Sequence, residues 1–137
     1  MLDTSAVIAL IERKHGGVRG LVSAQSELPN VSIITVGELE HGLETALDDV
    51  QRRRRMWTLQ ACDRMAVVDI DRATARLYGG LSAQVPRRVG SADRWIVACA
   101  MRAGAALVTF DSALADALAQ RPTSPDHPPI TMILLDT

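Results

Sequence analysis

Four acidic residues are spaced widely along the chain, and their types and positions suggest a shared chemistry. They are Asp3, Glu38, Asp93 and Asp111. Carboxylates that lie a few ångströms apart repel one another, and a cation between them offsets that repulsion. Carboxylate oxygens are hard ligands that suit Mg²⁺ or Mn²⁺. Such ions bind phosphates and activate water, so the four residues predict metal-dependent cleavage of a phosphodiester bond.

Two hydroxyl residues accompany the acids. Ser5 lies two residues after Asp3, and Thr109 lies two residues before Asp111. Either hydroxyl could donate to a carboxylate, a water molecule or a phosphate. The structural alternatives are helix capping for Ser5 and strand propensity for Thr109.

Each acid also has a structural explanation when it is taken alone. Asp93 would favour the N-terminus of a helix through the helix dipole, and Asp3 and Asp111 are suitable N-cap residues. Glu38 is the hardest to explain in this way, because its segment is apolar and we expect it to be largely buried. The joint placement of all four favours one common site.

The elements that would position these residues follow from short apolar runs separated by helical patterns. Runs of strand length occupy 31–34, 66–70, 106–109 and 131–135. Apolar periodicity and capping residues predict helices over 5–13, 18–27, 36–46, 49–61, 71–85, 91–103 and 112–119. The helix over 91–103 begins at Ser91, a good cap residue, and stops before Gly104.

This alternation predicts an α/β fold. We expect one domain over residues 1–137, with three α/β/α layers and a short, mainly parallel central sheet. Ligands of such sheets bind outside the carboxyl ends of the strands. Each of the four acids follows a predicted strand, directly or at the start of the next helix, so we expect them to converge at that edge.

Composition excludes several classes of protein. A chain of 137 residues with 47% hydrophobic residues is typical of a globular domain, and no apolar run is long enough to span a membrane. The first residues lack the basic region of a signal peptide, so we expect a cytoplasmic protein. Cys62 and Cys99 match no metal or redox spacing and are expected in the core.

Arginine supplies almost all of the positive charge. Lys14 is the only lysine, and the net charge of −1 gives no sign of nucleic-acid binding by itself. Arg87, Arg88 and Arg94 lie close to Asp93 in the sequence, where they could contact an RNA backbone. The run Arg52–Arg55 would fan around a helix, so we interpret it as a solvated surface.

The chain resembles the PIN domain family, and within it the VapC toxins. Four segments carry the resemblance, and their order and spacing agree with the family over essentially the whole chain. They are Leu2-Asp3-Thr4-Ser5-Ala6-Val7-Ile8, Ile34-Thr35-Val36-Gly37-Glu38-Leu39-Glu40-His41-Gly42, Ala92-Asp93-Arg94-Trp95-Ile96-Val97-Ala98 and Leu107-Val108-Thr109-Phe110-Asp111. The first strand is shorter than in the family, since only Met1 and Leu2 precede Asp3.

The resemblance implies an endoribonuclease that depends on Mg²⁺ or Mn²⁺. By motif its acidic ligands would be Asp3, Glu38, Asp93 and Asp111, and Ser5 and Thr109 would support them. It further implies a homodimer, structured cellular RNA as substrate, and a cognate VapB-like antitoxin whose tail covers the acidic site.

Other functions remain open at this point. A phosphoacceptor receiver domain or an Asp-nucleophile phosphatase would need a lysine late in the chain, and none follows Lys14. No P-loop motif is present. A non-catalytic PIN-fold module that binds RNA or protein, and a nuclease directed at DNA, both stay possible. The working hypothesis is hydrolysis of RNA by metal-activated water, with the arginines positioning the backbone.

Overall fold

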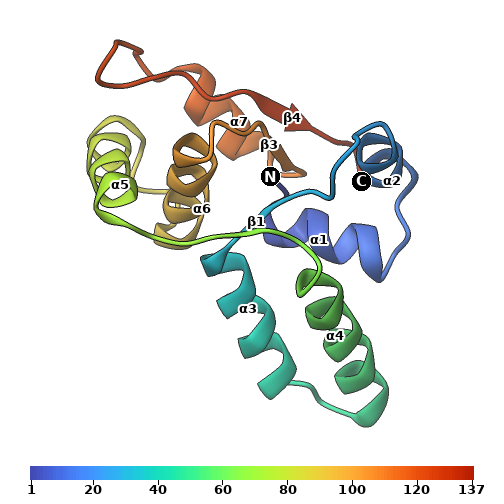
Figure 1. Ribbon diagram of the computed structural model, residues 1–137. Helices are drawn as coiled ribbons and strands as arrows, with labels where there is room; N and C mark the ends of the chain where they lie inside the picture. Colours follow the sequence, from blue (N-terminus) through green and yellow to red (C-terminus); the bar gives the residue numbers. More distant parts are fainter.

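The computed structural model describes residues 1–137, which form seven helices and four short strands (Figure 1). The helices are α1 (Thr4–Ile11), α2 (Gly16–Ser23), α3 (Ile33–Glu44), α4 (Asp49–Cys62), α5 (Arg72–Gln84), α6 (Ser91–Arg102) and α7 (Ser112–Ala119). The strands are β1 (Val31–Ser32), β2 (Val67–Val68), β3 (Leu107–Thr109) and β4 (Met132–Leu134). None of the helices has the length and apolar character that crossing a membrane requires.

The central sheet is parallel, and residue Leu2 joins its two halves. Strand β1 pairs in parallel with β2, and β3 pairs in parallel with β4. Between these pairs, Leu2 forms parallel bridges to Val31 of β1 and to Val108 of β3. The order across the sheet is therefore β2, β1, Leu2, β3, β4. The predicted parallel sheet is confirmed, although its strands are shorter than the apolar runs that predicted them.

Helices cover both faces of this sheet. Adjacent strand residues point to opposite faces, and Leu107 and Val108 of β3 belong to two separate buried clusters. The cluster around Leu107 draws on α5, α6 and α7, whereas the cluster around Val108 draws on α1, α2, α3 and α4. Cys62 and Cys99 are free thiols buried in these clusters, as the sequence predicts. Figure 1 shows α3 and α4 projecting from the body as a helical hairpin.

The strand predicted over 31–34 ends two residues early. We expected a strand over 31–34 and a helix from residue 36, but α3 already begins at Ile33. The Ser32 hydroxyl accepts the backbone N–H of Thr35 at 3.0 Å and caps the helix. This cap outweighs the β-propensity of the adjacent Ile33-Ile34 pair. Glu38 consequently lies in the second turn of α3.

The start of α6 also differs from the prediction. Gly90 occupies the N-cap position and makes no side-chain cap, so Ser91 is the first helical residue. The Ser91 hydroxyl lies instead 3.2 Å from the Tyr78 hydroxyl of α5, and the Tyr78 ring stacks on Trp95 with centroids 3.8 Å apart. These contacts hold α5 against the first turns of α6. The helix stops as predicted, and Gly104 takes the left-handed conformation, with φ +62°.

An ion pair joins the first residues of α5 to the end of α6. Asp71 caps α5, and the Arg102 guanidinium donates to its carboxylate at 3.0 Å. Hydrogen bonding to Arg102 holds the pKa of Asp71 well below its usual range, and the N–H and hydroxyl of Thr74 lower it further. A depressed folded-state pKa gives stability that is present above the unfolded pKa near 4 and is lost as the pH falls below it.

Replacing Asp71 should therefore have a pH-dependent effect. Asp71→Asn keeps a side chain that can cap α5 but loses the charge, so it should lower the melting temperature by a few degrees at pH 7. The difference from the unaltered protein should shrink as the pH falls below about 4. Thermal melts between pH 7 and pH 2.5 measure this, with Asp126→Asn, an exposed acid without an ion pair, as control. A difference that stays constant with pH would contradict the assignment.

Candidate active site

The four predicted acids come from four different helices, three of them at or near the helix start and Glu38 in the second turn of α3. Asp3 caps α1, and its backbone N–H donates to the carbonyl of Val108 in β3 at 3.1 Å. Asp111 follows β3 and caps α7. Glu38 lies on α3, which directly follows β1, and Asp93 lies in the first turn of α6.

Asp93 lies within electrostatic reach of the other three acids. Its partial burial raises the pKa of the Asp93 carboxyl above the usual range, and the charges of Asp111, Glu38 and Asp3 raise it further. Repulsion from three separate carboxylates requires that all three are near Asp93. The structure thus places the other three acids near enough to Asp93 to repel its charge, although the four do not close around a single point.

Two of the acids hold their orientation through helix capping. Oδ1 of Asp3 accepts the backbone N–H of Ala6 at 2.8 Å and the hydroxyl of Ser5 at 2.9 Å. Oδ1 of Asp111 accepts the backbone N–H of Leu114 at 2.9 Å. Both residues therefore do cap a helix, as the structural explanation of each acid taken alone proposed. In each carboxylate, Oδ2 receives no hydrogen bond from the protein.

Glu38 follows the same pattern on α3. Its Oε1 accepts a hydrogen bond from the Thr4 hydroxyl at 2.6 Å, and no protein group donates to Oε2. Glu38 is exposed, so the expectation that it would be buried is wrong. Its apolar neighbour Leu39 points into the core, while Glu38 points outward, because successive helical residues are rotated by about 100°. Three carboxylates thus keep one oxygen anchored and one oxygen free.

The two predicted hydroxyls support the acids in different ways. Ser5 donates its hydroxyl to Asp3, and it is not a cap residue. Thr109 is fully buried in β3, and its hydroxyl oxygen accepts the backbone N–H of Asp111 at 3.0 Å. Thr109 therefore fixes the backbone at Asp111 as the chain leaves the strand.

The three predicted RNA-contacting arginines do not share one environment. Arg88 lines a small hollow of about 80 Å³ together with Asp93 and Asp111. Arg87 is exposed on the adjoining loop. Arg94 is turned toward α5, where its guanidinium carbon lies 5.5 Å from the centre of the Tyr78 ring. Only Arg88 lines the hollow that Asp93 and Asp111 share.

The donor set fits a divalent cation in its chemistry. The four carboxylates together have five oxygens that receive no hydrogen bond from the protein, one each on Asp3, Glu38 and Asp111 and both on Asp93. These are the hard ligands that Mg²⁺ or Mn²⁺ prefers, and a cation would relieve the repulsion at Asp93. As the side chains stand, no group of three or more His, Cys, Asp or Glu residues is arranged to hold a metal ion directly. Magnesium keeps several of its waters when bound, so carboxylates at longer spacing suit it.

Comparison with known proteins decides the family. The PIN domain family matches residues 1–118, which is most of the chain. This chain belongs to the PIN domain family. A relative named ribonuclease VapC4, from Mycobacterium tuberculosis, is 33% identical over 85 residues, covering 60% of this chain. That match spans 65% of the relative's own length.

Solved structures agree with this PIN fold. The DNA-bound VapBC complex from Salmonella typhimurium contains a chain with a TM-score of 0.75 and 26% identity, covering 97% of this chain and 95% of that one. VapBC2 from Rickettsia felis, bound to a DNA fragment from its promoter, gives a TM-score of 0.75 over 99% of this chain and 98% of that one. At 18% identity, the second likeness supports the fold alone.

One residue of this PIN site was missed by the sequence analysis. Thr4 stands between Asp3 and Ser5, and its hydroxyl bonds to Glu38, 34 residues away. Ser32 and Thr35 stand three residues apart, which is the spacing of a helix cap. The sequence therefore did contain a signal that α3 begins before Glu38. The bond from Thr4 to Glu38 depends on how α1 packs against α3, which no local pattern reveals.

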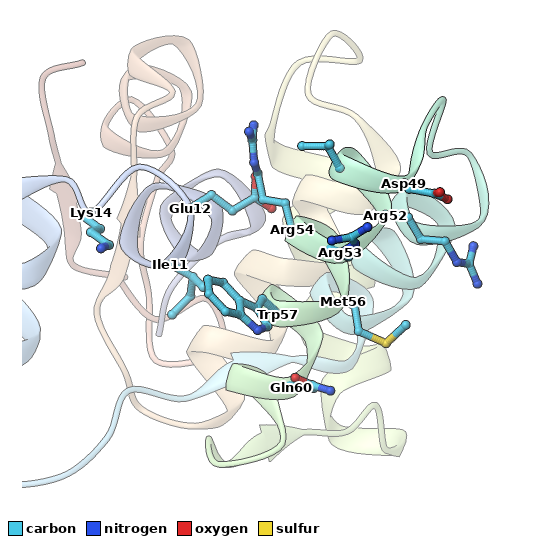
Figure 2. A pocket seen from close by; sticks show the side chains of 11 residues that line it. Ile11, Glu12, Lys14, Asp49, Arg52, Arg53, Arg54, Met56, Trp57 and Gln60 are labelled. Atoms are coloured by element: carbon cyan, nitrogen blue, oxygen red, sulfur yellow. The ribbon is translucent and has the colours of Figure 1, made fainter.

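The PIN domain has a second concave surface, which lies between α1 and α4. This groove of about 670 Å³ is shown in Figure 2 and is called the α1–α4 groove below. Trp57 lies beside Ile11 within it, and Trp57 is 73% exposed. The buried Thr58 hydroxyl donates to Glu12 at 2.8 Å and ties the two helices together.

The arginine run on α4 divides between this groove and the helical hairpin. Arg55 donates to the carbonyl of Gly42 at the end of α3. Arg52, Arg53 and Arg54 line the α1–α4 groove and are exposed. Of these three, Arg52 also donates to the carbonyl of Leu43 on α3 at 3.4 Å. The predicted solvated surface is thus partly correct, because the arginines line the same groove as the apolar side chain of Trp57.

Proposed function

We propose that this chain is a metal-dependent endoribonuclease, the toxin of a VapBC-type toxin–antitoxin pair, acting on cellular RNA in the cytoplasm. One observation carries the proposal: Asp3, Glu38 and Asp111, from three other helices, lie near Asp93, and each of the four carboxylates keeps at least one oxygen without a hydrogen bond from the protein. Its ligand set would be Asp3, Glu38, Asp93 and Asp111 with Mg²⁺ or Mn²⁺. The VapC4 relative, which is named a ribonuclease, supports RNA as the substrate.

The residues would divide the work of phosphodiester hydrolysis among them. A bound divalent ion supplies activation of the attacking water and offsets the charge that develops on the phosphate. Ser5 and Thr109 keep Asp3 and Asp111 oriented through the hydrogen bonds described above. Arg88, on the same hollow as Asp93, is placed to contact the phosphate backbone next to the scissile bond.

We propose further that an antitoxin helix docks in the α1–α4 groove. The solved relatives are toxin–antitoxin complexes by their titles, which supports a protein partner for this chain. The groove combines an exposed apolar patch around Trp57 with four cations and two acids: Lys14, Arg52, Arg53, Arg54, Glu12 and Asp49. An amphipathic helix with an apolar stripe flanked by acidic residues complements this surface.

Cleavage assays on RNA and DNA test the enzymatic proposal. Purified, antitoxin-free protein is stripped of metal, resupplied with Mn²⁺ and incubated with total cellular RNA or with single- and double-stranded DNA. We expect cuts in RNA and none in DNA at the same enzyme concentration. Cleavage of DNA alone would instead identify a DNA-directed nuclease. Binding of RNA without cleavage, by protein shown to be folded, would identify a non-catalytic PIN module.

A further inference from the structure

A chain of hydroxyl groups leads from the buried start of α3 to the Glu38 carboxylate. The Ser32 and Thr35 hydroxyl oxygens lie 3.2 Å apart, the Thr35 and Thr4 hydroxyl oxygens lie 3.2 Å apart, and Thr4 Oγ1 lies 2.6 Å from Glu38 Oε1. Ser32 and Thr35 are fully buried, whereas Thr4 is half-buried and Glu38 is exposed. The chain therefore connects the core to the acidic site.

The Thr4 hydroxyl is the donor in the contact with Glu38, because an ionised carboxylate can only accept. Of the two Thr4 contacts, the one to Glu38 is the shorter, at 2.6 Å against 3.2 Å to the Thr35 hydroxyl oxygen. Thr35 Oγ1 also accepts from the Ser32 hydroxyl at 3.2 Å, and Ser32 Oγ accepts the backbone N–H of Thr35 at 3.0 Å. Buried groups at the start of α3 thus hold the neighbourhood of Thr4, and the bond from Thr4 to Glu38 is the contact that reaches the acidic site.

The bond from Thr4 to Glu38 has a consequence for the geometry of the site. Thr4 is the first residue of α1 and directly follows Asp3, so its bond links the position of Glu38 on α3 to that of Asp3. The bond occupies Oε1 and leaves Oε2 as the oxygen available to a cation. An exposed glutamate has several rotamers, and a fixed hydrogen bond reduces the entropy lost when it binds a ligand.

We propose that Thr4 is a positioning residue for Glu38, and that its hydroxyl preorganises this carboxylate for divalent-cation binding. The inference rests on the proposed metal-dependent function. Partners of this kind that orient a ligand change metal affinity by about 10- to 100-fold when they are lost. Thr4→Val has nearly the same shape but no hydroxyl, whereas Thr4→Ser keeps the hydroxyl.

Binding of Mn²⁺ alone, measured by electron paramagnetic resonance of the free ion, tests the proposal without reference to activity. We expect Thr4→Val to raise the Kd by about tenfold or more. Thr4→Ser should stay within about threefold of the unaltered protein, since its hydroxyl can make the same bond. Thr45→Val removes an exposed hydroxyl from the far end of α3 and should leave the Kd unchanged. Thr4→Ala, which adds no volume, serves as a second variant if Thr4→Val folds poorly.

The possible outcomes separate this inference from the proposed function. A Kd for Thr4→Val within twofold of the unaltered protein would overturn the inference and leave the proposed function intact. Equal weakening by Thr4→Ser and Thr4→Val would also overturn it, because the cause would then be packing. If the unaltered protein bound no Mn²⁺, the metal site of the proposed function would be wrong and this inference with it.

Discussion

Asp93→Asn should abolish RNA cleavage while leaving the protein folded. Asparagine has nearly the same shape as aspartate but lacks the negative charge that a divalent cation requires. We expect the cleavage rate to fall by at least about 10³-fold, which corresponds to about 4 kcal/mol of lost transition-state stabilisation. Single-turnover cleavage of a defined RNA at fixed Mn²⁺ measures the loss. Asp116→Asn, an exposed acid on α7, should cleave at the normal rate.

The same variant should not be destabilised in the absence of metal. Asp93 is partly buried and is repelled by three other carboxylates, so its charge disfavours the metal-free fold. Asp93→Asn removes that repulsion and should melt at or above the temperature of the unaltered protein in EDTA. An inactive variant that melts well below the unaltered protein would indicate a structural role, and a variant with more than a tenth of the normal rate would argue against a catalytic one.

Trp57→Ala should weaken antitoxin binding more than any other single change in the α1–α4 groove. Its indole is the largest apolar side chain that lines the groove, and it is 73% exposed in the isolated chain. Truncating an aromatic residue at the centre of an interface typically weakens the binding free energy by about 2 kcal/mol or more, which is about a 30-fold loss of affinity. Titration calorimetry with the cognate antitoxin gives the Kd.

A matched control separates docking in the groove from general surface hydrophobicity. Leu28 is also exposed, at 59%, and lines a different pocket beside the N-terminus. Leu28→Ala should leave the antitoxin Kd within about twofold, since peripheral contacts carry little binding energy. RNA cleavage by free Trp57→Ala should also be unchanged, because Trp57 does not line the hollow beside Asp93. Equal effects of the two substitutions would refute the groove as the docking surface.

The convergence of the acids was predictable because it follows from the topology. Asp3, Glu38 and Asp111 each follow a strand or bridged residue of the parallel sheet, and the carboxyl ends of such strands share an edge. Asp93 is different, because its helix α6 follows α5 and not a strand. The sequence could therefore place Asp3 and Asp111 near each other without any side-chain detail. Leu2 completes the sheet with a single bridged residue on each side, so even the very short first strand put Asp3 in position.

The features that were missed depend on competition between local signals or on tertiary packing. Ile33 and Ile34 have the pattern of a strand, but the Ser32 cap begins a helix there. Ser91 has the character of a cap, yet its hydroxyl lies against Tyr78 of another helix. The bond from Thr4 to Glu38 joins the first residue of α1 to the second turn of α3. Short-range periodicity contains no information about such pairs.

The most direct test of the central claim is the chemistry of the ends that the protein leaves on cellular RNA. Metal-stripped protein is incubated with total RNA, with EDTA or with Mn²⁺, and the new ends are mapped and chemically typed. We predict discrete cuts only with Mn²⁺, and none of them should carry a 2′,3′-cyclic phosphate, because water and not the ribose 2′-hydroxyl attacks the phosphorus. Cuts that persist in EDTA, or that end in a cyclic phosphate, would contradict metal-dependent hydrolysis by the four acids.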